Sequence, residues 1–181
     1  MIQNVISVIN KEINNFLKLR FDLTEDKLQV SHLVNQDGSV AFNGENKLIC
    51  SLINIEQEKV NLNSRVSAAP KINPPVNLNL YLLYSAYFSS ENVDEAFKFL
   101  TALIAFFQRK TVFTPQNTPM LSPQIDKITF EMINLDLNEM SNLWAAIGAK
   151  YIPSVIYKVR MISITEEAII ADVPIISGID Q

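Results

Sequence analysis

Residues 136–164 read DLNEMSNLWAAIGAKYIPSVIYKVRMISI, and this stretch decides the fold. Asp136 and Glu139 have the spacing of a capping box, so the sequence predicts a helix that begins here. Gly148 is expected to end this helix, because glycine readily adopts the left-handed conformation that follows a last helical turn. After a short turn, alternating side chains over 154–164 predict a long strand. A helix followed directly by a strand indicates a mixed α and β domain.

The predicted helix and strand each have an apolar side that is expected to be buried. The helix carries one apolar stripe, made of Met140, Leu143, Trp144 and Ile147. Trp144, the only tryptophan, is expected to pack in the core, with a role as an interface anchor as the alternative. One face of the strand is expected to carry Val155, Tyr157, Val159 and Met161. The other is expected to carry Ile156, Lys158, Arg160 and Ile162.

Upstream of this stretch the chain alternates further helices and strands. Apolar residues at helical spacing over 2–20 predict a first helix. Ser89 and Ser90 offer N-caps for a second helix, which runs through Phe107. The polar side of the first helix is expected to carry Asn4, Asn10, Asn14 and Asn15.

Strands are expected at 28–34, 48–57, 77–88 and 127–135, with a brief strand at 112–113. Asp37-Gly38 marks a turn between the first two strands. The order α-β-β-β-α-β-α-β predicts an α+β fold (an α/β sandwich), in which a mainly antiparallel sheet is flanked by helices.

Two segments fall outside this pattern. Residues 58–76 contain three prolines, which deny ladder hydrogen bonds, and predict an exposed, mobile loop that contacts a partner. A plain connector is the alternative. Residues 166–181 form an apolar tail too short for its own core, expected either to fold back as an edge strand or to reach another subunit. The domain organisation is therefore a single domain over 1–165 with a C-terminal tail.

The composition narrows the function classes. The 181 residues are 48% hydrophobic and 19% charged, as in a globular domain with its own core. A net charge of −4 with scattered Lys and Arg argues against nucleic-acid binding, which uses a basic surface. Neither a signal peptide nor a membrane span of about 20 apolar residues is expected. The single cysteine, Cys50, lies in an apolar run and is expected to be buried and unreactive. One cysteine allows no internal disulfide, which favours assembly inside the cell.

The sequence shows no recognisable catalytic, cofactor-binding or metal site. His32 is the only histidine, and no Cys lies near it in the sequence, so a metal site is not expected. Glu56 and Glu58 share one face at a strand end, where solvent exposure is expected rather than a raised pKa. Neither a glycine-rich phosphate loop nor a nucleophile elbow is present. The chain is therefore not expected to be an enzyme, and its large apolar surface indicates structure or assembly.

Four passages, taken in order, resemble a known family. They are ICSLINIEQEKVNLNSR (49–65), PPVNLNLYLLYSAYF (74–88) leading into ENVDEAFKFLTALIAFFQRKTVF (91–113), KITFEMINLDLNEMSNLW (127–144) and GAKYIPSVIYKVRMISI (148–164). This order is similar to that of the small cap or tail-terminator proteins of phage-tail-like contractile injection systems. No passage is a catalytic signature, so the resemblance depends on the succession of several patterns.

The resemblance implies a structural cap with the fold of a phage tail terminator. Such a protein forms a six-fold ring on the distal end of the inner tube, contacts the last sheath layer, ends polymerisation and fixes particle length. Its partners would be further copies of itself, the inner tube protein and the sheath protein, with no nucleic acid and no direct membrane insertion. It would be assembled in the bacterial cytoplasm. A tube end is an open heterologous interface, which a cap must match on one side only.

Chemistry and position suggest the interface residues. They are Arg65 in the proline-rich loop, Trp144, Lys150 and Tyr151 around the turn, Lys158 and Arg160 on the last strand, and Ile169, Ile170, Ile175 and Ile176 in the tail. Exposed sheet edges and the tail are expected to pair with sheath arms by strand addition.

Other interpretations stay open. An adaptor or assembly chaperone would bind another particle component or an effector as a monomer or dimer, without changing particle length. A small enzyme would need a convergent polar pocket, which no group of residues supplies. Family members often extend beyond the last strand, so this chain is expected to be a minimal form, an adaptor beneath a second cap protein, or a version attached to the envelope elsewhere.

Overall fold

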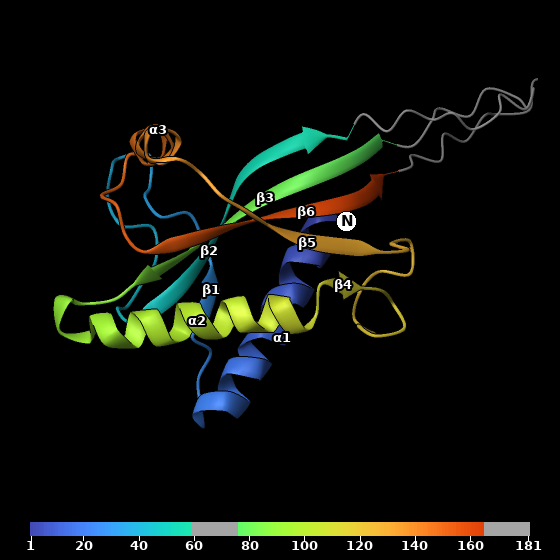
Figure 1. The fold of residues 1–181 in the computed structure, drawn as a ribbon, viewed down its shortest axis with the longest axis horizontal. Coiled ribbons are helices and arrows are strands. Elements are labelled where there is room, and N and C mark those ends of the chain that lie inside the picture. The colour runs from blue at the N-terminus through green and yellow to red at the C-terminus, as the bar shows by residue number, and fades with distance from the viewer. Residues whose placement is uncertain (59–75, 165–181) are drawn as a thin grey trace, which may run out of the picture.

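The computed structural model describes residues 1–58 and 76–164, which form an α+β fold (Figure 1). The helices are α1 (Ile2–Phe21), α2 (Val93–Arg109) and α3 (Leu137–Ile147), with a 3₁₀ turn η1 (Ser90–Asn92) before α2. The strands are β1 (Leu28–Val30), β2 (Lys47–Gln57), β3 (Val76–Tyr87), β4 (Val112–Phe113), β5 (Ile128–Ile133) and β6 (Ser154–Ile164). The predicted fold class and order of elements are confirmed.

The six strands of the described residues make one sheet in the order β1-β2-β3-β6-β5-β4. All neighbours pair antiparallel except β1 and β2, which are parallel. A parallel pair needs a long crossover, and residues 31–46 supply it without a helix. The predicted Asp37-Gly38 turn lies within this crossover, where Gly38 has φ 81° and Val34 bridges Val40. The mainly antiparallel sheet is therefore confirmed.

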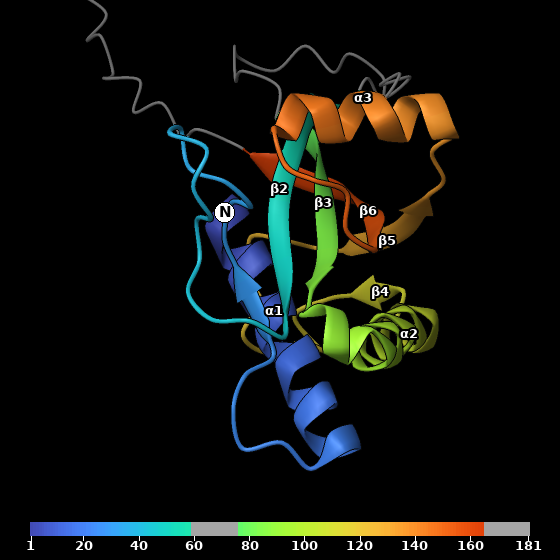
Figure 2. The same ribbon diagram turned by 90° about the vertical axis from the view of Figure 1, so that its left-hand side faces the viewer.

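Helices α1 and α2 cover one face of the sheet and build the larger core (Figure 2). α1 contributes a buried stripe that includes Ile9, Ile13 and Leu17. α2 brings Phe107, whose ring lies 4.2 Å from Tyr157 and 4.6 Å from Phe130 by centroid distance. Burying a side chain of this size stabilises the fold by roughly 1.5–3 kcal/mol.

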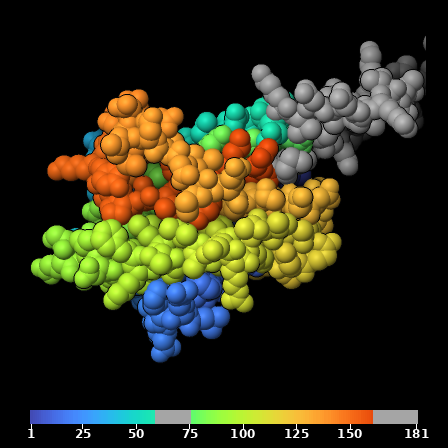
Figure 3. Space-filling model, in the orientation of Figure 1, coloured from blue at the N-terminus to red at the C-terminus, as the bar shows by residue number. Residues whose placement is uncertain are grey.

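The opposite face of the sheet carries a smaller core beneath α3 and the 31–46 crossover (Figure 2). Leu33 and Phe42 come from the crossover and Trp144 from α3. Alternation along β3 and β6 supplies Leu83 and Ile156 from the sheet. In the space-filling view, α2 forms a ridge across the front, α3 stands above it, and the end of α1 projects below (Figure 3).

Two asparagines correct the prediction for α1. Asn10 and Asn14 were assigned to the polar side but are buried, at 4% and 6% exposure. The Asn14 amide donates to the Leu28 carbonyl oxygen at 2.8 Å, and its oxygen accepts from the backbone N–H groups of Leu28 and Lys27 at 2.8 and 3.1 Å. Periodicity missed this position because a carboxamide can be buried when backbone groups satisfy it.

Two boundaries also differ from the sequence prediction. The strand expected at 28–34 ends at Val30, because the chain turns away after Ser31 and buries Leu33 in the smaller core. Ser89 and Ser90 do not cap α2, since the 3₁₀ turn intervenes and Asn92 is the N-cap residue.

The last strand contains an irregularity. The register shifts between the pairs Leu80–Val159 and Leu78–Ile162, so β6 has one extra residue there. A bulge of this kind interrupts the regular ladder of β6 between Val159 and Ile162.

Candidate assembly interface

The helix–turn–strand unit is set by two helix caps. The Glu139 N–H donates to the Asp136 carboxylate at 2.8 Å, and the Asp136 N–H donates to the Glu139 carboxylate at 3.0 Å. Gly148 has φ 74° and donates its N–H to the Trp144 carbonyl oxygen at 3.1 Å. The predicted capping box and glycine cap are therefore both confirmed, and they fix where the turn at 148–153 lies.

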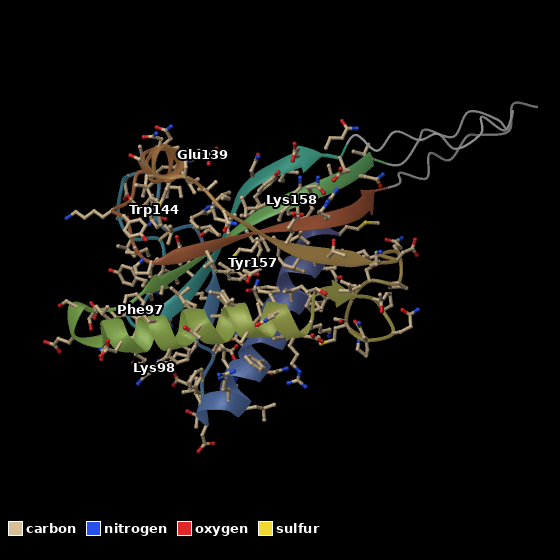
Figure 4. The ribbon with its side chains drawn as sticks, in the orientation of Figure 1. Phe97, Lys98, Glu139, Trp144, Tyr157 and Lys158 are labelled. Carbon is tan, nitrogen blue, oxygen red and sulfur yellow. The ribbon has the colours of Figure 1, made fainter. Side chains whose placement is uncertain are left out.

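Trp144 anchors α3 to the sheet, whereas the turn that follows is exposed (Figure 4). Trp144 is only 5% exposed and packs in the smaller core, as predicted. The Tyr151 ring stands edge-on to the indole at 5.5 Å and is 58% exposed. Lys150 is exposed and has no ion-pair partner among the described residues. Trp144 thus positions the turn, and Lys150 and Tyr151 are the side chains that a partner can reach.

A cavity of about 410 Å³ opens beside this turn. It is lined by apolar side chains of the crossover and of the turn, including Val40, Phe42, Trp144 and Ile152. Lys150 also lines it, which places one cation against an apolar hollow. No local pattern in the sequence indicates that Val40 and Phe42 belong to this surface, because they lie far from the turn along the chain.

The second predicted surface lies on the same face of the sheet, beyond the edge of α3. Figure 4 shows Tyr157 and Lys158 on opposite sides of β6. The Tyr81 hydroxyl donates to the Glu56 carboxylate at 2.6 Å. Lys158 Nζ donates to the same oxygen at 3.3 Å and lies 5.4 Å from the Tyr81 ring centroid. Lys158 is therefore already paired within the chain.

Arg160 is paired in the next row of the sheet. Its guanidinium lies 3.4 Å from the Glu58 carboxylate and 3.6 Å from that of Glu131. The Asn79 amide also donates to Glu58, at 2.6 Å. Together with Glu56, Tyr81 and Lys158, these four side chains make a polar patch across the β2, β3, β6 and β5 region of the sheet. Its members are Glu56, Glu58, Asn79, Tyr81, Glu131, Lys158 and Arg160. The sequence signals for this patch were the spacing of Glu56 and Glu58 and that of Lys158 and Arg160.

Hydrogen bonds in this patch favour the ionised carboxylates. The Tyr81 hydroxyl, followed by Lys158, holds the pKa of Glu56 below its usual value. The Asn79 amide lowers the pKa of Glu58 in the same way, with a smaller effect of Arg160. The predicted solvent exposure holds for Glu56, whereas the Glu58 side chain is only 19% exposed. Neither pKa is raised.

The remaining predicted interface residues lie outside the described part of the chain. They are Arg65, Ile169, Ile170, Ile175 and Ile176.

Within the described ranges, no three His, Cys, Asp or Glu side chains gather as metal ligands. Burial raises the pKa of the Cys50 thiol to about 11. No helix in the described residues combines the length and apolarity needed to cross a bilayer.

The family of the chain follows from comparison with known sequences. A search of curated proteins finds no match. The family model described as the Pvc16 N-terminal domain matches residues 4–177. The chain belongs to this family. The resemblance to cap and tail-terminator proteins of contractile injection systems is thereby confirmed.

Two solved structures share the fold of this Pvc16 N-terminal domain. One is the PVC sheath/tube terminator of an extracellular contractile injection system in its extended state, with a TM-score of 0.56 and 14% identity over 97% of this chain and 63% of that chain. The other is the anti-feeding prophage cap, a tube-terminating cap, with a TM-score of 0.51 and 14% identity over 96% of this chain and 60% of that chain. The chain thus spans about three fifths of the length of both structures.

Proposed function

We propose that this Pvc16 N-terminal domain acts as a structural cap, which binds the distal end of the inner tube and the last sheath layer of a contractile injection system. Capping would end polymerisation and fix the length of the particle. The match of the family model to residues 4–177 carries this proposal. The fold shared with a sheath/tube terminator and a tube-terminating cap supports it, and supports a role without catalysis.

The turn at 148–153 is the surface that we assign to partner contact. Tyr151 is exposed beside an apolar cavity, and aromatic side chains at such rims are frequent binding hot spots. Lys150 adds a cation without a partner in the described residues, which suits an acidic group on the partner.

Lys158 and Arg160 would meet a partner differently, because Glu56 and Glu58 already engage them. Partner carboxylates would have to replace these internal ones. Exchanging these surface ion pairs for pairs with a partner would have a small net effect, because such pairs gain little over contacts with water. The polar patch would therefore contribute specificity more than affinity.

The proposed assembly is a ring of six copies on the tube end. A head-to-tail interface closes into a ring when the rotation between neighbouring copies divides a full turn. Such a ring has two different faces, so that one can bind the tube while the other prevents further addition. The inner tube protein, the sheath protein and a second cap protein are the proposed partners. Assembly in the bacterial cytoplasm is part of the same proposal.

Electron microscopy of particles from a producer strain that lacks this chain tests the proposal. Overlong, variable-length or unsheathed tubes are expected, and restoring the gene should return a uniform length. Uniform particles of normal length in the deletion strain would overturn the terminator role and favour the adaptor or chaperone alternative.

A further inference from the structure

An open apolar groove runs between α1 and the edge strand β1. Its cavity volume is about 690 Å³. Ile2 and Ile6 line it from the helix and Leu28 and Val30 from the strand. Val30 is paired with the buried Cys50 across the ladder, yet it is 50% exposed. The helix thus leaves this corner of its own sheet face uncovered.

The strand that borders the groove has one free position for a further strand. The Ser31 N–H bonds the Cys50 carbonyl and the Leu48 N–H bonds the Lys27 carbonyl, so odd-numbered residues of β1 point their backbone groups toward β2. Leu28 and Val30 then point theirs outward. Asn14 satisfies both groups of Leu28. The backbone groups of Val30 have no protein partner in the described residues.

The rim of the groove carries an unpaired cation. Lys11 lines the groove, is exposed, and has no ion-pair partner among the described residues. An extended, apolar segment with an acidic residue near its middle would fit this groove. Its apolar side chains would pack on the groove lining, its backbone would bond Val30, and its acidic residue would pair with Lys11.

The C-terminal tail contains such a segment. Residues 168–176 read AIIADVPII, with five large aliphatic side chains, Asp172 at the centre, and a proline of the kind that edge strands tolerate. The family model extends through residue 177, so the sequence pattern of this domain family includes the segment.

The end of β6 lies on the same side of the molecule as the groove. Both ribbon views place the N-terminus of α1 beside the end of β6, where the described chain stops (Figures 1 and 2). From Ile2 to Asn14 the helix rises about 18 Å. Five or six extended residues span roughly that length. Residues 168–176 are therefore long enough to fill the groove.

We propose that residues 168–176 of this chain occupy its own α1–β1 groove, packing their aliphatic side chains on Ile6 and Val30 and placing Asp172 near Lys11. The segment also bonds the outward backbone groups of Val30. In this position the segment covers the apolar surface that α1 leaves exposed. The tail is then packed on the domain and does not extend freely into solvent. The inference does not depend on the capping role, because it concerns the isolated chain.

Thiol labelling of the full-length chain tests this seat. Val30→Cys places a thiol in the groove, and Val40→Cys is the matched control, because Val40 is 48% exposed on the opposite side of the sheet. The native Cys50 is buried and should not react. We expect the thiol at position 30 to react at least about tenfold more slowly than that at position 40, as for a site that labels only after local opening.

A tail variant of the full-length chain completes the experiment. Adding Ile169→Asp and Ile170→Asp should raise the labelling rate at position 30 to that at position 40 and leave the latter unchanged. Equal rates at both positions with the native tail would overturn the proposal. Protection at position 30 that grows with protein concentration would also overturn it, since the occupant would then be the tail of a second copy.

Discussion

Tyr81 shows how one side chain organises the polar patch on the sheet. Its hydroxyl donates to Glu56, and its ring lies beneath the Lys158 ammonium, so two charges are held over one aromatic side chain. The hydrogen bond to Glu56 also raises the pKa of the tyrosine. A residue that alternation assigns simply to one face of a strand thus fixes the positions of two charged neighbours.

Replacing Tyr81→Phe should make stability less dependent on pH. Because the hydrogen bond lowers the pKa of Glu56 below 4.5 in the folded chain, it stabilises the fold above that pH, and the stabilisation is lost as pH falls through the lowered value. Melting temperatures measured against pH should therefore differ between the variant and the native chain at neutral pH and converge well below 4.5.

Tyr151→Phe is the control for this prediction, because the Tyr151 hydroxyl has no hydrogen-bond partner among the described residues. Its melting curve should follow that of the native chain at every pH. A constant difference between Tyr81→Phe and the native chain over the whole range would show that the hydroxyl acts without involving Glu56.

Helix α3 depends on its caps more than a deeply packed helix would. Trp144 is the only buried residue of α3. Three cavities, of about 190, 270 and 410 Å³, are lined in part by residues of this helix. α2, by contrast, buries seven residues in the larger core. Elements with few buried apolar contacts open most readily. The capping box of α3 therefore contributes a large share of what holds the exposed turn in position.

Asp136→Ala should destabilise the chain by about 1 kcal/mol, because one N-terminal N–H loses its side-chain acceptor. The free energy of unfolding measured in denaturant gives this value. Asn138→Ala is the matched control, since Asn138 is an exposed α3 residue with no side-chain hydrogen bond in the described structure, and it should leave stability nearly unchanged. Since alanine has the higher helix propensity, a loss in Asn138→Ala equal to that in Asp136→Ala would mean that the effect does not come from the cap.

At the scale of the whole molecule, the two faces of the sheet are covered to different extents. α1 and α2 close one face with a continuous core, whereas α3 covers only part of the other and leaves the polar patch and the turn accessible. The exposed side chains of the second face lie on a sheet that is stabilised by the core on its first face. Changes at the turn should therefore affect assembly and not folding.

The double substitution Lys150→Glu with Tyr151→Ala tests this separation, and it rests on the proposed function. We expect an unchanged melting temperature together with longer and more variable particles in electron micrographs of a strain that carries the variant. Leu19→Ser is the control, because Leu19 is 89% exposed at the far end of α1 and away from the turn. Normal particle length with the double variant would remove the turn from the interface.

Local patterns were sufficient for most elements of this chain. The capping box at Asp136 and the glycine cap at Gly148 depend on neighbours only a few residues apart, so the sequence located α3 correctly. For the same reason, alternation along the last strand correctly placed Ile156 and Tyr157 on opposite faces. Local patterns failed where groups distant in sequence interact. Asn14, for example, is buried because its amide donates to the Leu28 carbonyl oxygen.

The sequence by itself determined the helix and strand order, the α+β class and the family. Only the tertiary structure decided that Lys158 and Arg160 are paired with Glu56 and Glu58, that Phe42 lies beside the turn, and that a groove opens next to β1. The physical reason is distance along the chain. Caps and alternation act between neighbours in sequence, whereas charge pairing and the gaps left by packing depend on segments that only the folded sheet brings together.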